Sequence, residues 1–369
     1  MNQFFDQLQE QLNAQKPFVV YRKPNEDVVT AVLQEDAVLH YVKDYQESGF
    51  VFAPFDSNSA SILIPNKTII ITNYSAEEQT KSTADASTVN TSIQTEKEAH
   101  IALVKNGVSA ISKGLLTKVV LSRSIEKITQ KEPLALFKEL LATYKTAFCY
   151  LWYHPKVGMW LGATPEVLLK TTNQRIETSS LAGTQVYKEG EEPVWGEKEY
   201  NEQDVVTQFI KNELADKVVN LKAGSVASVR AGKLWHLRTK ITGVMHNNLK
   251  EILTALHPTP ATCGFPKLAA KEFILTHENY NRSFYTGFLG ELNFSKEQFR
   301  AKTKRNIENR AYTAITKVSN LYVNLRCAEL TQDVVKVYVG GGITIGSNPE
   351  KEWEETVAKS GTMLRIILK

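Results

Sequence analysis

The chain has few cysteines: three among 369 residues, Cys149, Cys263 and Cys327. Their number is odd and their spacing matches no common metal motif, which argues against a disulfide framework or a zinc site and favours buried thiols. No uncharged stretch approaches the roughly 20 residues that span a bilayer. The N-terminal MNQFFDQLQEQLNAQK also lacks the apolar core of a signal peptide. We therefore expect a cytoplasmic protein without a membrane partner.

Neither basic nor acidic residues are in large excess. The formal net charge is +4, and the basic residues are spread along the chain. This distribution lacks the basic patch typical of nucleic-acid-binding proteins, so no nucleic-acid partner is expected. Internal repeats and low-complexity tracts are absent as well. With 42% hydrophobic and 23% charged residues, the chain is long enough for one large domain or two smaller ones.

Strand-like and helical patterns alternate along the chain. Residues 1 to about 73 suggest a helix and then short strands such as FVVYRK and GFVFAPF. A polar segment rich in Ser, Thr and Glu follows, and we expect it to be a solvated connector. Further helices are expected at 97–113, 133–144, 197–215, 265–276 and 350–359. Between them lie β-branched strands such as LTKVVLSRSIEKI and LYVNLRCAEL, and paired strands with intervening helices predict an α+β fold.

The stretch GGGITIGSNPEKEWEETVAK gathers carboxylates at one helix start. With Pro349 in the first turn, Glu352, Glu355 and Lys359 fall on one helical face. Acidic residues complement the dipole at a helix N-terminus, so capping and solubility are the ordinary explanation.

A second acidic helix start favours another explanation. In GEKEYNEQDVVTQF, Glu199 and Glu202 lie three residues apart on a predicted helix. Two helices with paired carboxylates, and no His or Cys nearby, offer the oxygen ligands that suit Mg²⁺. That the two pairs meet in space is a hypothesis.

Polar residues in apolar surroundings fit an anionic substrate. Arg326 lies within the apolar pattern LYVNLRCAEL, and a buried guanidinium needs an anion, either a substrate or a structural carboxylate. Lys118 begins the strand TKVVLSR, where burial would disfavour its ammonium unless the side chain snorkels to the strand end. Glu166 follows Thr-Pro between two apolar strands, where it is either a protonated acid or a solvated turn residue.

These pieces together resemble the chorismate-utilising enzymes, the family of isochorismate, salicylate, anthranilate and aminodeoxychorismate synthases. The similarity covers roughly residues 95 to 369 and rests on ordered motifs: KVVLSR, LGATPEVLL, LAGT, EKEYNE, LWHL, LHPTPATCGFPK, ENYNRSFYTGFLGEL, VNLR and GGGIT…PEKEWEETVAK. It implies an α+β, chorismate-binding fold like that of anthranilate synthase component I, with two stacked antiparallel sheets flanked by helices. Residues 1–95 would add a helix and edge strands to a catalytic region at 96–369, in one compact domain.

The resemblance also implies a Mg²⁺ cofactor and two sets of binding residues. Glu202 and Glu355 would bind the metal, with Glu199 and Glu352 as nearby or water-mediated ligands, and Lys359 would face the site. Chorismate carries two carboxylates, and its ring carboxylate would lie on Mg²⁺ and the backbone of Gly183 and Thr184. Its enolpyruvyl carboxylate would meet Arg326, Tyr285 and the amide of Gly342.

Further positions indicate which member of the family the sequence resembles most. Lys118 matches the general base of members that use water, so the resemblance implies water attack at C2, with Glu166 as the acid that protonates the departing C4 hydroxyl. Ala261 in HPTPATCG matches isochorismate synthases, where salicylate synthases typically have threonine. His236 in LWHL matches an active-site histidine, although a lone histidine is more often a packing residue. The prediction is isochorismate synthase, an isomerase; a salicylate synthase, an ammonia-using synthase and a non-catalytic chorismate-binding protein are the alternatives.

The sequence departs from the family pattern at three places. Gln203 stands where a histidine is common, Glu291 where a tryptophan is usual, and SKEQFRAKTKRNIENR is an added basic segment. That segment predicts a solvated helix, or else a docking surface for an acidic partner such as the next enzyme of the isochorismate pathway. We expect a monomer; the sequence leaves menaquinone and siderophore biosynthesis equally open.

Overall fold

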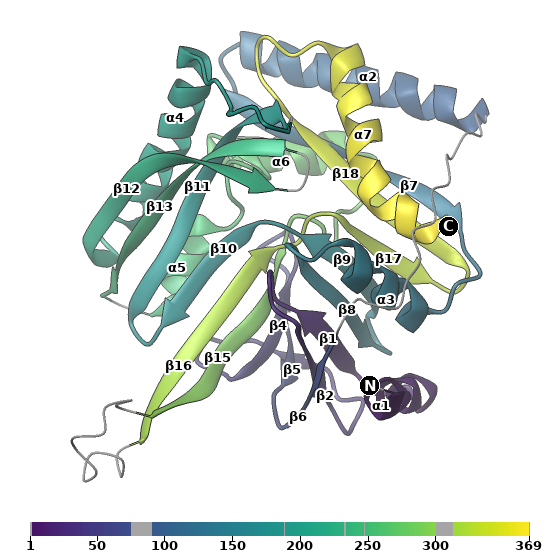
Figure 1. The fold of residues 1–369 in the computed structure, drawn as a ribbon. Coiled ribbons are helices and arrows are strands. Elements are labelled where there is room, and N and C mark those ends of the chain that lie inside the picture. Colours follow the sequence, from purple (N-terminus) through teal and green to yellow (C-terminus); the bar gives the residue numbers. More distant parts are fainter. Residues whose placement is uncertain are drawn as a thin grey trace.

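Two large antiparallel sheets form the centre of the molecule (Figure 1). The computed structural model describes residues 2–74, 91–187, 189–231, 234–246, 248–299 and 313–368. The first sheet has nine strands, in the order β14 (Gly264–Phe265), β7 (Lys118–Ile128), β18 (Val334–Ile343), β17 (Cys327–Thr331), β9 (Gly158–Thr164), β8 (Phe148–His154), β1 (Phe18–Arg22), β2 (Val28–Leu33) and β6 (Thr68–Asn73). Neighbouring strands in it pair antiparallel.

The second sheet is also nine-stranded and antiparallel. Its order is β12 (Val218–Ala231), β13 (Leu234–Met245), β11 (Arg175–Val186), β10 (Val167–Thr172), β16 (Thr313–Val323), β15 (Phe288–Phe299), β4 (Gly49–Ala53), β5 (Ile62–Pro65) and β3 (His40–Tyr41). The N-terminal strands therefore complete one edge of each sheet: β1, β2 and β6 in the first, β3, β4 and β5 in the second.

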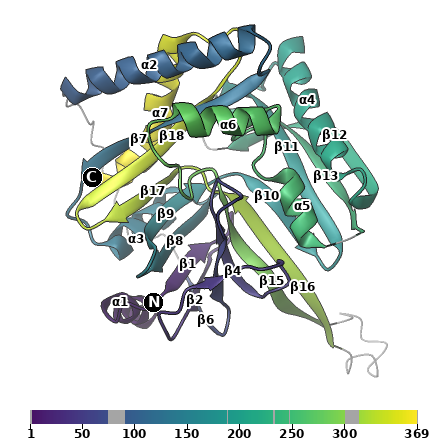
Figure 2. The same cartoon turned by 180° about the vertical axis from the view of Figure 1, so that it is seen from behind.

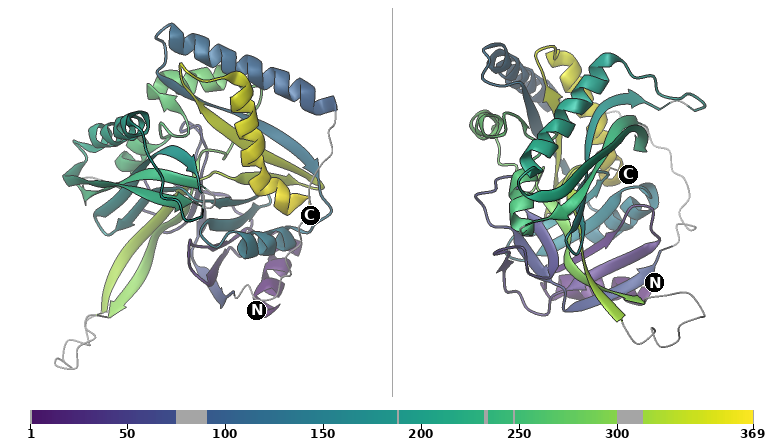
Figure 3. Two further views of the ribbon diagram at one scale, coloured as in Figure 1. Left: turned by 45° about the horizontal axis from the view of Figure 1, so that its top comes forward. Right: turned by 90° about the vertical axis from the view of Figure 1, so that its left-hand side faces the viewer.

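Seven helices are described, and they lie outside the sheets (Figures 2 and 3). They are α1 (Asn2–Asn13), α2 (Thr91–Ser112), α3 (Pro133–Thr143), α4 (Glu197–Leu214), α5 (Leu249–Leu256), α6 (Lys267–His277) and α7 (Pro349–Ile367). Helices α1, α3 and α7 pack on the first sheet, α4 and α5 on the second, and α2 and α6 beside β7. The expected α+β fold of two stacked antiparallel sheets with flanking helices is confirmed. None of the described helices is long and apolar enough to cross a membrane.

Aromatic side chains fill the space between the two sheets. Phe148 of the first sheet stacks on Tyr322 of the second with ring centroids 4.2 Å apart, and Phe52 stacks on Phe284 at the same distance. These rings are buried, and burying each one contributes roughly 1.5–3 kcal/mol. This packing holds the sheets in a fixed relation, which matters because the candidate site lies where the chain crosses between them.

Glu291 also joins the two sheets. Its carboxylate accepts hydrogen bonds from Tyr21 (2.7 Å) and Asn320 (2.8 Å) and pairs with Lys23 at 2.9 Å. Burial alone would raise the pKa of Glu291, but Lys23 and these hydrogen bonds lower it below the usual value. The glutamate that replaces the family's usual tryptophan is thus a satisfied polar link in the core.

Two crossovers carry the chain from one sheet to the other. Residues 165–166 link β9 to β10, and residues 324–326 link β16 to β17. The expectation of one continuous strand through Arg326 is therefore wrong. Arg326 has a left-handed φ of 49° and is the last residue of the crossover, directly before β17. The buried Asn324 stabilises this turn by accepting from the Tyr150 hydroxyl (2.7 Å) and donating to the Phe284 carbonyl (2.9 Å).

Several element boundaries differ from the sequence expectation. Helix α2 begins at Thr91 rather than at 97, and α7 continues past 359 to Ile367 because Met363, Ile366 and Ile367 keep its core-facing side apolar. Its N-cap is Asn348, whose side chain accepts from two backbone N–H groups. In the basic segment, residues 295–299 continue β15 instead of forming a helix, and residues 300–310 lie outside the described part. Of the expected connector, residues 75–90 are likewise outside it.

Candidate active site

Glu166 lies in the crossover between β9 and β10, at the edge of a small pocket. Its backbone N–H donates to the Thr164 hydroxyl (3.3 Å), and its carbonyl accepts from the N–H of Val323 (3.0 Å) in β16. The pocket lining includes the apolar residues Leu168, Leu181, Val206, Phe209, Leu256 and Ala261. Burial raises the pKa of Glu166 to about 7, although the ammonium groups of Lys118 and Lys359 oppose the shift. The pocket therefore keeps this carboxyl protonated in weakly acidic solution, as a proton donor requires.

The raised pKa of Glu166 predicts a pH-dependent stability difference. Because the folded-state value exceeds the unfolded one, the stabilising effect of the protonated carboxyl is full below about pH 4.5 and is lost as the pH rises through about 7. Glu166→Gln cannot ionise, so its stability relative to the parent should increase by about 2–3 kcal/mol between pH 4.5 and pH 8. Thermal melts of both proteins across this range measure it, and parallel melting curves at every pH would contradict the burial of this charge.

Two lysines pair with acidic residues of the two acidic helices. The Nζ of Lys118, at the start of β7, lies 3.4 Å from Glu202 Oε1 in α4. The Nζ of Lys359 lies 2.5 Å from Glu355 Oε1 in α7 and donates to the carbonyl of Gly340 at 3.0 Å. The Lys118 side chain keeps 22% of its surface exposed, so it is less buried than its strand context predicts. Such partly exposed ion pairs each contribute at most about 1 kcal/mol to stability. Little free energy is therefore lost when a bound ion or ligand replaces one partner of a pair.

The three consecutive glycines of β18 leave room for these side chains. A Cβ at position 342 would lie 2.9 Å from Cε of Lys118, and one at position 340 would lie 3.0 Å from the Tyr285 hydroxyl. A Cβ at position 341 would lie 3.3 Å from Oε2 of Glu352 and 3.9 Å from Oε1 of Glu355. The absence of side chains at these three positions therefore lets a lysine, a phenol and two carboxylates lie against one strand.

The α7 carboxylates fit a divalent cation. Oε2 of Glu352 is buried without a hydrogen-bond partner. Burial raises the pKa of Glu352; a hydrogen bond with Ser347 opposes this shift, and the neighbouring carboxylate of Glu355 adds to it. An orphaned carboxylate oxygen beside a second carboxylate is the kind of arrangement that a hard cation would satisfy.

The α4 carboxylates have other partners in this structure. Glu202 pairs with Lys118, and Oε2 of Glu199 accepts from the N–H of Gly196 (2.9 Å) at the start of its own helix. Within the residues that the structure describes, no three His, Cys, Asp or Glu side chains lie together in a metal-binding cluster. The four-glutamate ligand set therefore stays a prediction.

Arg326 projects from the second crossover and offers an anion-binding group. Its Nη1 donates to the Thr362 hydroxyl at 2.6 Å, and no carboxylate among the described residues lies within ion-pair distance of its guanidinium. Burial lowers the pKa of Arg326, while Tyr285, Tyr144 and Glu355 oppose that shift. A largely buried guanidinium without a carboxylate partner is typical of a site that receives an anion.

Gly183 of β11 forms another wall of the candidate site. Its φ is +68°, and an added Cβ would lie 3.3 Å from the Trp195 ring and 3.4 Å from Cβ of Glu199. The Nδ1 of His236 in β13 lies 3.0 Å from the Gly183 carbonyl, so this nitrogen carries the proton. Burial lowers the pKa of His236, which favours the neutral ring. Thr184 follows in the strand, but its side chain lies outside the described residues.

Two residues of this region have partners that the sequence analysis did not predict. Trp195 covers Gly183 and donates from Nε1 to the Ser228 hydroxyl at 2.8 Å. Gln203 is buried and donates to Ser180 and Thr239, which joins α4 to the second sheet where the family often has histidine. These partners are distant in sequence, so no local pattern points to them.

Comparison with known proteins agrees with the motifs. The model of the chorismate binding enzyme family matches residues 55–300, and a second model with the same description matches residues 312–365. The isochorismate synthase DhbC of Bacillus subtilis is 28% identical over 286 residues, or 72% of this chain and 66% of the relative. The isochorismate synthase EntC of Escherichia coli is 30% identical over 262 residues, or 68% of this chain and 62% of the relative. This chain thus spans slightly less than two thirds of the length of these relatives.

A solved structure extends the comparison to the fold. The menaquinone-specific isochorismate synthase MenF of Escherichia coli superposes with a TM-score of 0.71 at 20% identity, covering 96% of this chain and 89% of that one. At this identity the match shows similarity of fold alone. It also covers the N-terminal strands, which lie outside the region of the family motifs. With family models that together match most of its length, the chain belongs to the chorismate-binding enzyme family.

Proposed function

We propose that the protein is an isochorismate synthase, which converts chorismate to isochorismate. The observation that supports this proposal is the environment of Glu166: its pKa is raised to about 7, and it lies within electrostatic reach of Lys118 and Lys359. Lys118 is the position at which water-using members of the family carry their base. The curated relatives named isochorismate synthases support the same assignment.

Lys118 and Glu166 would divide the proton transfers between them. Lys118 would accept a proton from a water molecule whose oxygen bonds to C2 of the ring. The ring double bonds shift and the C4–O bond breaks as Glu166 donates a proton to the leaving hydroxyl, which departs as water. One water enters and one leaves, and the two side chains return to their starting protonation states through solvent. Each transfer contributes roughly 10²–10⁴-fold to the rate.

The remaining residues would hold the substrate by its two carboxylates. Arg326, which has no carboxylate partner among the described residues, would bind the enolpyruvyl carboxylate together with the Tyr285 hydroxyl and the N–H of Gly342. The backbone of Gly183 and Thr184 would receive the ring carboxylate. Orientation by such contacts is worth several further powers of ten, because it fixes C2 and C4 relative to the base and the acid.

Mg²⁺ is the cofactor that we propose for this site, with Glu202 and Glu355 as ligands and Glu199 and Glu352 beside them. When bound, it would offset the negative charge of the ring carboxylate and fix its orientation. The unpartnered oxygen of Glu352 supports such a cation.

Removal of a proposed ligand tests this cofactor. Glu355→Ala should lose the Mg²⁺ dependence of turnover, because one carboxylate of the set is gone and Lys359 loses its counterion. The matched control is Glu354→Ala, an exposed glutamate on the same helix. Titration of activity and of calorimetric heat with MgCl₂ should give a normal curve for the control and a flat or strongly shifted one for Glu355→Ala. An unchanged curve for Glu355→Ala would remove that residue from the ligand set.

Product identification tests the function itself. The purified protein is incubated with chorismate and Mg²⁺, with and without EDTA, and the products are separated and identified by mass spectrometry. Isochorismate without pyruvate, lost on chelation, is the expected result. Salicylate with pyruvate would identify the protein as a salicylate synthase and contradict the interpretation of Ala261 as a mark of isochorismate synthases. Chorismate recovered unchanged would indicate a non-catalytic binding protein.

A further inference from the structure

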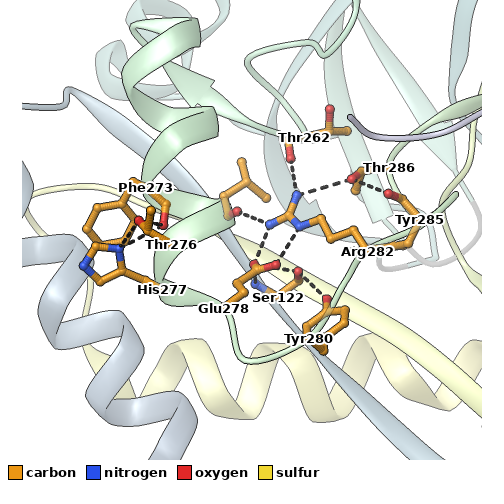
Figure 4. Close-up of polar contacts among 11 residues, drawn as sticks. Ser122, Thr262, Phe273, Thr276, His277, Glu278, Tyr280, Arg282, Tyr285 and Thr286 are labelled. Atoms are coloured by element: carbon orange, nitrogen blue, oxygen red, sulfur yellow. Dashed lines mark hydrogen bonds and ion pairs between the residues drawn. The ribbon is translucent and has the colours of Figure 1, made fainter. Parts of the chain in front are cut away.

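A buried arginine behind the candidate site uses all its hydrogen-bond donors. Arg282 lies between α6 and β15, and its side chain is 2% exposed. Its Nε and Nη2 donate to the two oxygens of Glu278, at 2.7 and 2.5 Å. The other donations go to the carbonyls of Val120 (2.7 Å) and Thr262 (3.0 Å) and to the hydroxyl of Thr286 (3.3 Å). Figure 4 shows Glu278, Thr262 and Thr286 around the guanidinium. Five donors thus meet five acceptors, the full capacity of an arginine.

The partner carboxylate is also fully engaged. Glu278 accepts from the backbone N–H and the hydroxyl of Ser122 in β7, both at 2.7 Å, and the Ser122 hydroxyl lies 2.6 Å from that of Tyr280. Burial by itself works against the charge of Arg282, but Glu278 raises its pKa above the usual value. The guanidinium therefore stays charged, and its ion pair with Glu278 is linked to β7 through Ser122.

Arg282 hydrogen-bonds to three separate segments of the chain. In each segment, a residue of the proposed site lies within two residues of the group that accepts the hydrogen bond. Val120 lies two residues after Lys118 in β7. Thr262 directly follows Ala261, which lines the pocket of Glu166. Thr286 directly follows Tyr285 and donates to its carbonyl at 2.6 Å. One guanidinium thus ties together the strand of the base, the pocket wall and the segment of the tyrosine.

We propose that Arg282 and Glu278 are positioning residues of the reaction: their buried pair sets the relative placement of Lys118, the pocket at Ala261, and Tyr285. The inference rests on the proposed function. Neither side chain needs to touch the substrate, and their effect passes through the three attached segments. A displacement of about 1 Å at reacting groups costs on the order of 10²-fold in rate, so loss of this pair should slow turnover more than it weakens binding.

Three variants and a matched control test the proposal in the full-length protein. Arg282→Lys keeps the charge but offers three donors instead of five, Glu278→Gln removes the carboxylate, and Thr286→Val removes one acceptor with little change in volume. The control is Glu291→Gln, which also removes a buried, ion-paired glutamate but joins strands that carry none of the proposed site residues. Each protein is melted to establish its folded fraction, and kcat and KM for chorismate are measured per folded molecule.

The expected results separate positioning from stability. Arg282→Lys and Glu278→Gln should lower kcat about 10²-fold and Thr286→Val about 5-fold, with KM within about 3-fold of the parent. Glu291→Gln should melt at a lower temperature yet keep kcat within about 2-fold. If Arg282→Lys does not fold, the other two variants decide. Variants that lose melting temperature but keep the kcat of the control would overturn the positioning role alone, whereas a parent protein that makes no isochorismate would overturn it together with the proposed function.

Discussion

Lys118→Ala should lower kcat for isochorismate formation by about 10²–10⁴-fold, because it removes the side chain proposed to accept the proton of the attacking water. Binding should survive, since the carboxylate contacts proposed for Arg326 and Gly342 do not involve this side chain. The side chain of Lys118 occupies the space into which a Cβ at position 342 would project, so alanine at position 118 leaves a space rather than a clash. Steady-state kinetics at saturating Mg²⁺, with chorismate affinity measured by calorimetry, separates the two effects.

The control for this prediction is Lys127→Ala, at the other end of the same strand. It should retain the kinetics of the parent, because it removes a lysine of β7 without touching the site. A primary amine added to Lys118→Ala should restore part of the lost rate, as a diffusible substitute for the missing base. Full activity of Lys118→Ala without any added amine would refute the assignment of Lys118 as the base.

Glu166→Gln should lower kcat by a similar factor of about 10²–10⁴, since an amide cannot donate the proton that the C4 hydroxyl needs to depart. The pH profile gives a sharper test. The acid acts in its protonated form, and the pKa of Glu166 is raised to about 7, so kcat/KM of the parent should fall as the pH rises through about 7. The residual activity of Glu166→Gln should lack this decline.

Glu177→Gln is the matched control for the second prediction. Glu177 is a partly exposed glutamate of β11 that pairs with Lys240, so its replacement should change neither kcat nor the pH profile. If Glu166→Gln retained the parent's alkaline decline, another group would be responsible for it. If it retained full kcat as well, Glu166 would have no role in proton donation.

Local patterns predicted much of the fold. The Gly-Glu and Asn-Pro sequences mark the N-termini of α4 and α7. Runs of aromatic and β-branched residues predicted most strands of the two sheets. Such patterns did not predict the crossover between the sheets at Arg326, because LYVNLRCAEL is mostly apolar and has no glycine or proline to mark a turn. The turn depends on the side chain of Asn324 bonding to Tyr150 and Phe284, which are distant in sequence.

The candidate site was predictable as a list of residues but not as an arrangement. Carboxylate pairs three residues apart are visible in the sequence, whereas their partners Lys118 and Lys359 in space are not. The raised pKa of Glu166 depends on pocket walls from α4 and from the segment after α5. Arg282 illustrates the same limit: its partner Glu278 is four residues away, but its other acceptors come from β7 and two separate loops.

The central claim is that water supplies the new hydroxyl of the product, and the most direct test uses water labelled with heavy oxygen. Chorismate and Mg²⁺ are incubated with the protein in labelled water, and isochorismate is analysed by mass spectrometry at early times. The account predicts one labelled oxygen, at C2, in each isochorismate molecule formed. Unlabelled isochorismate would contradict water attack, and recovery of chorismate alone would contradict the proposed function.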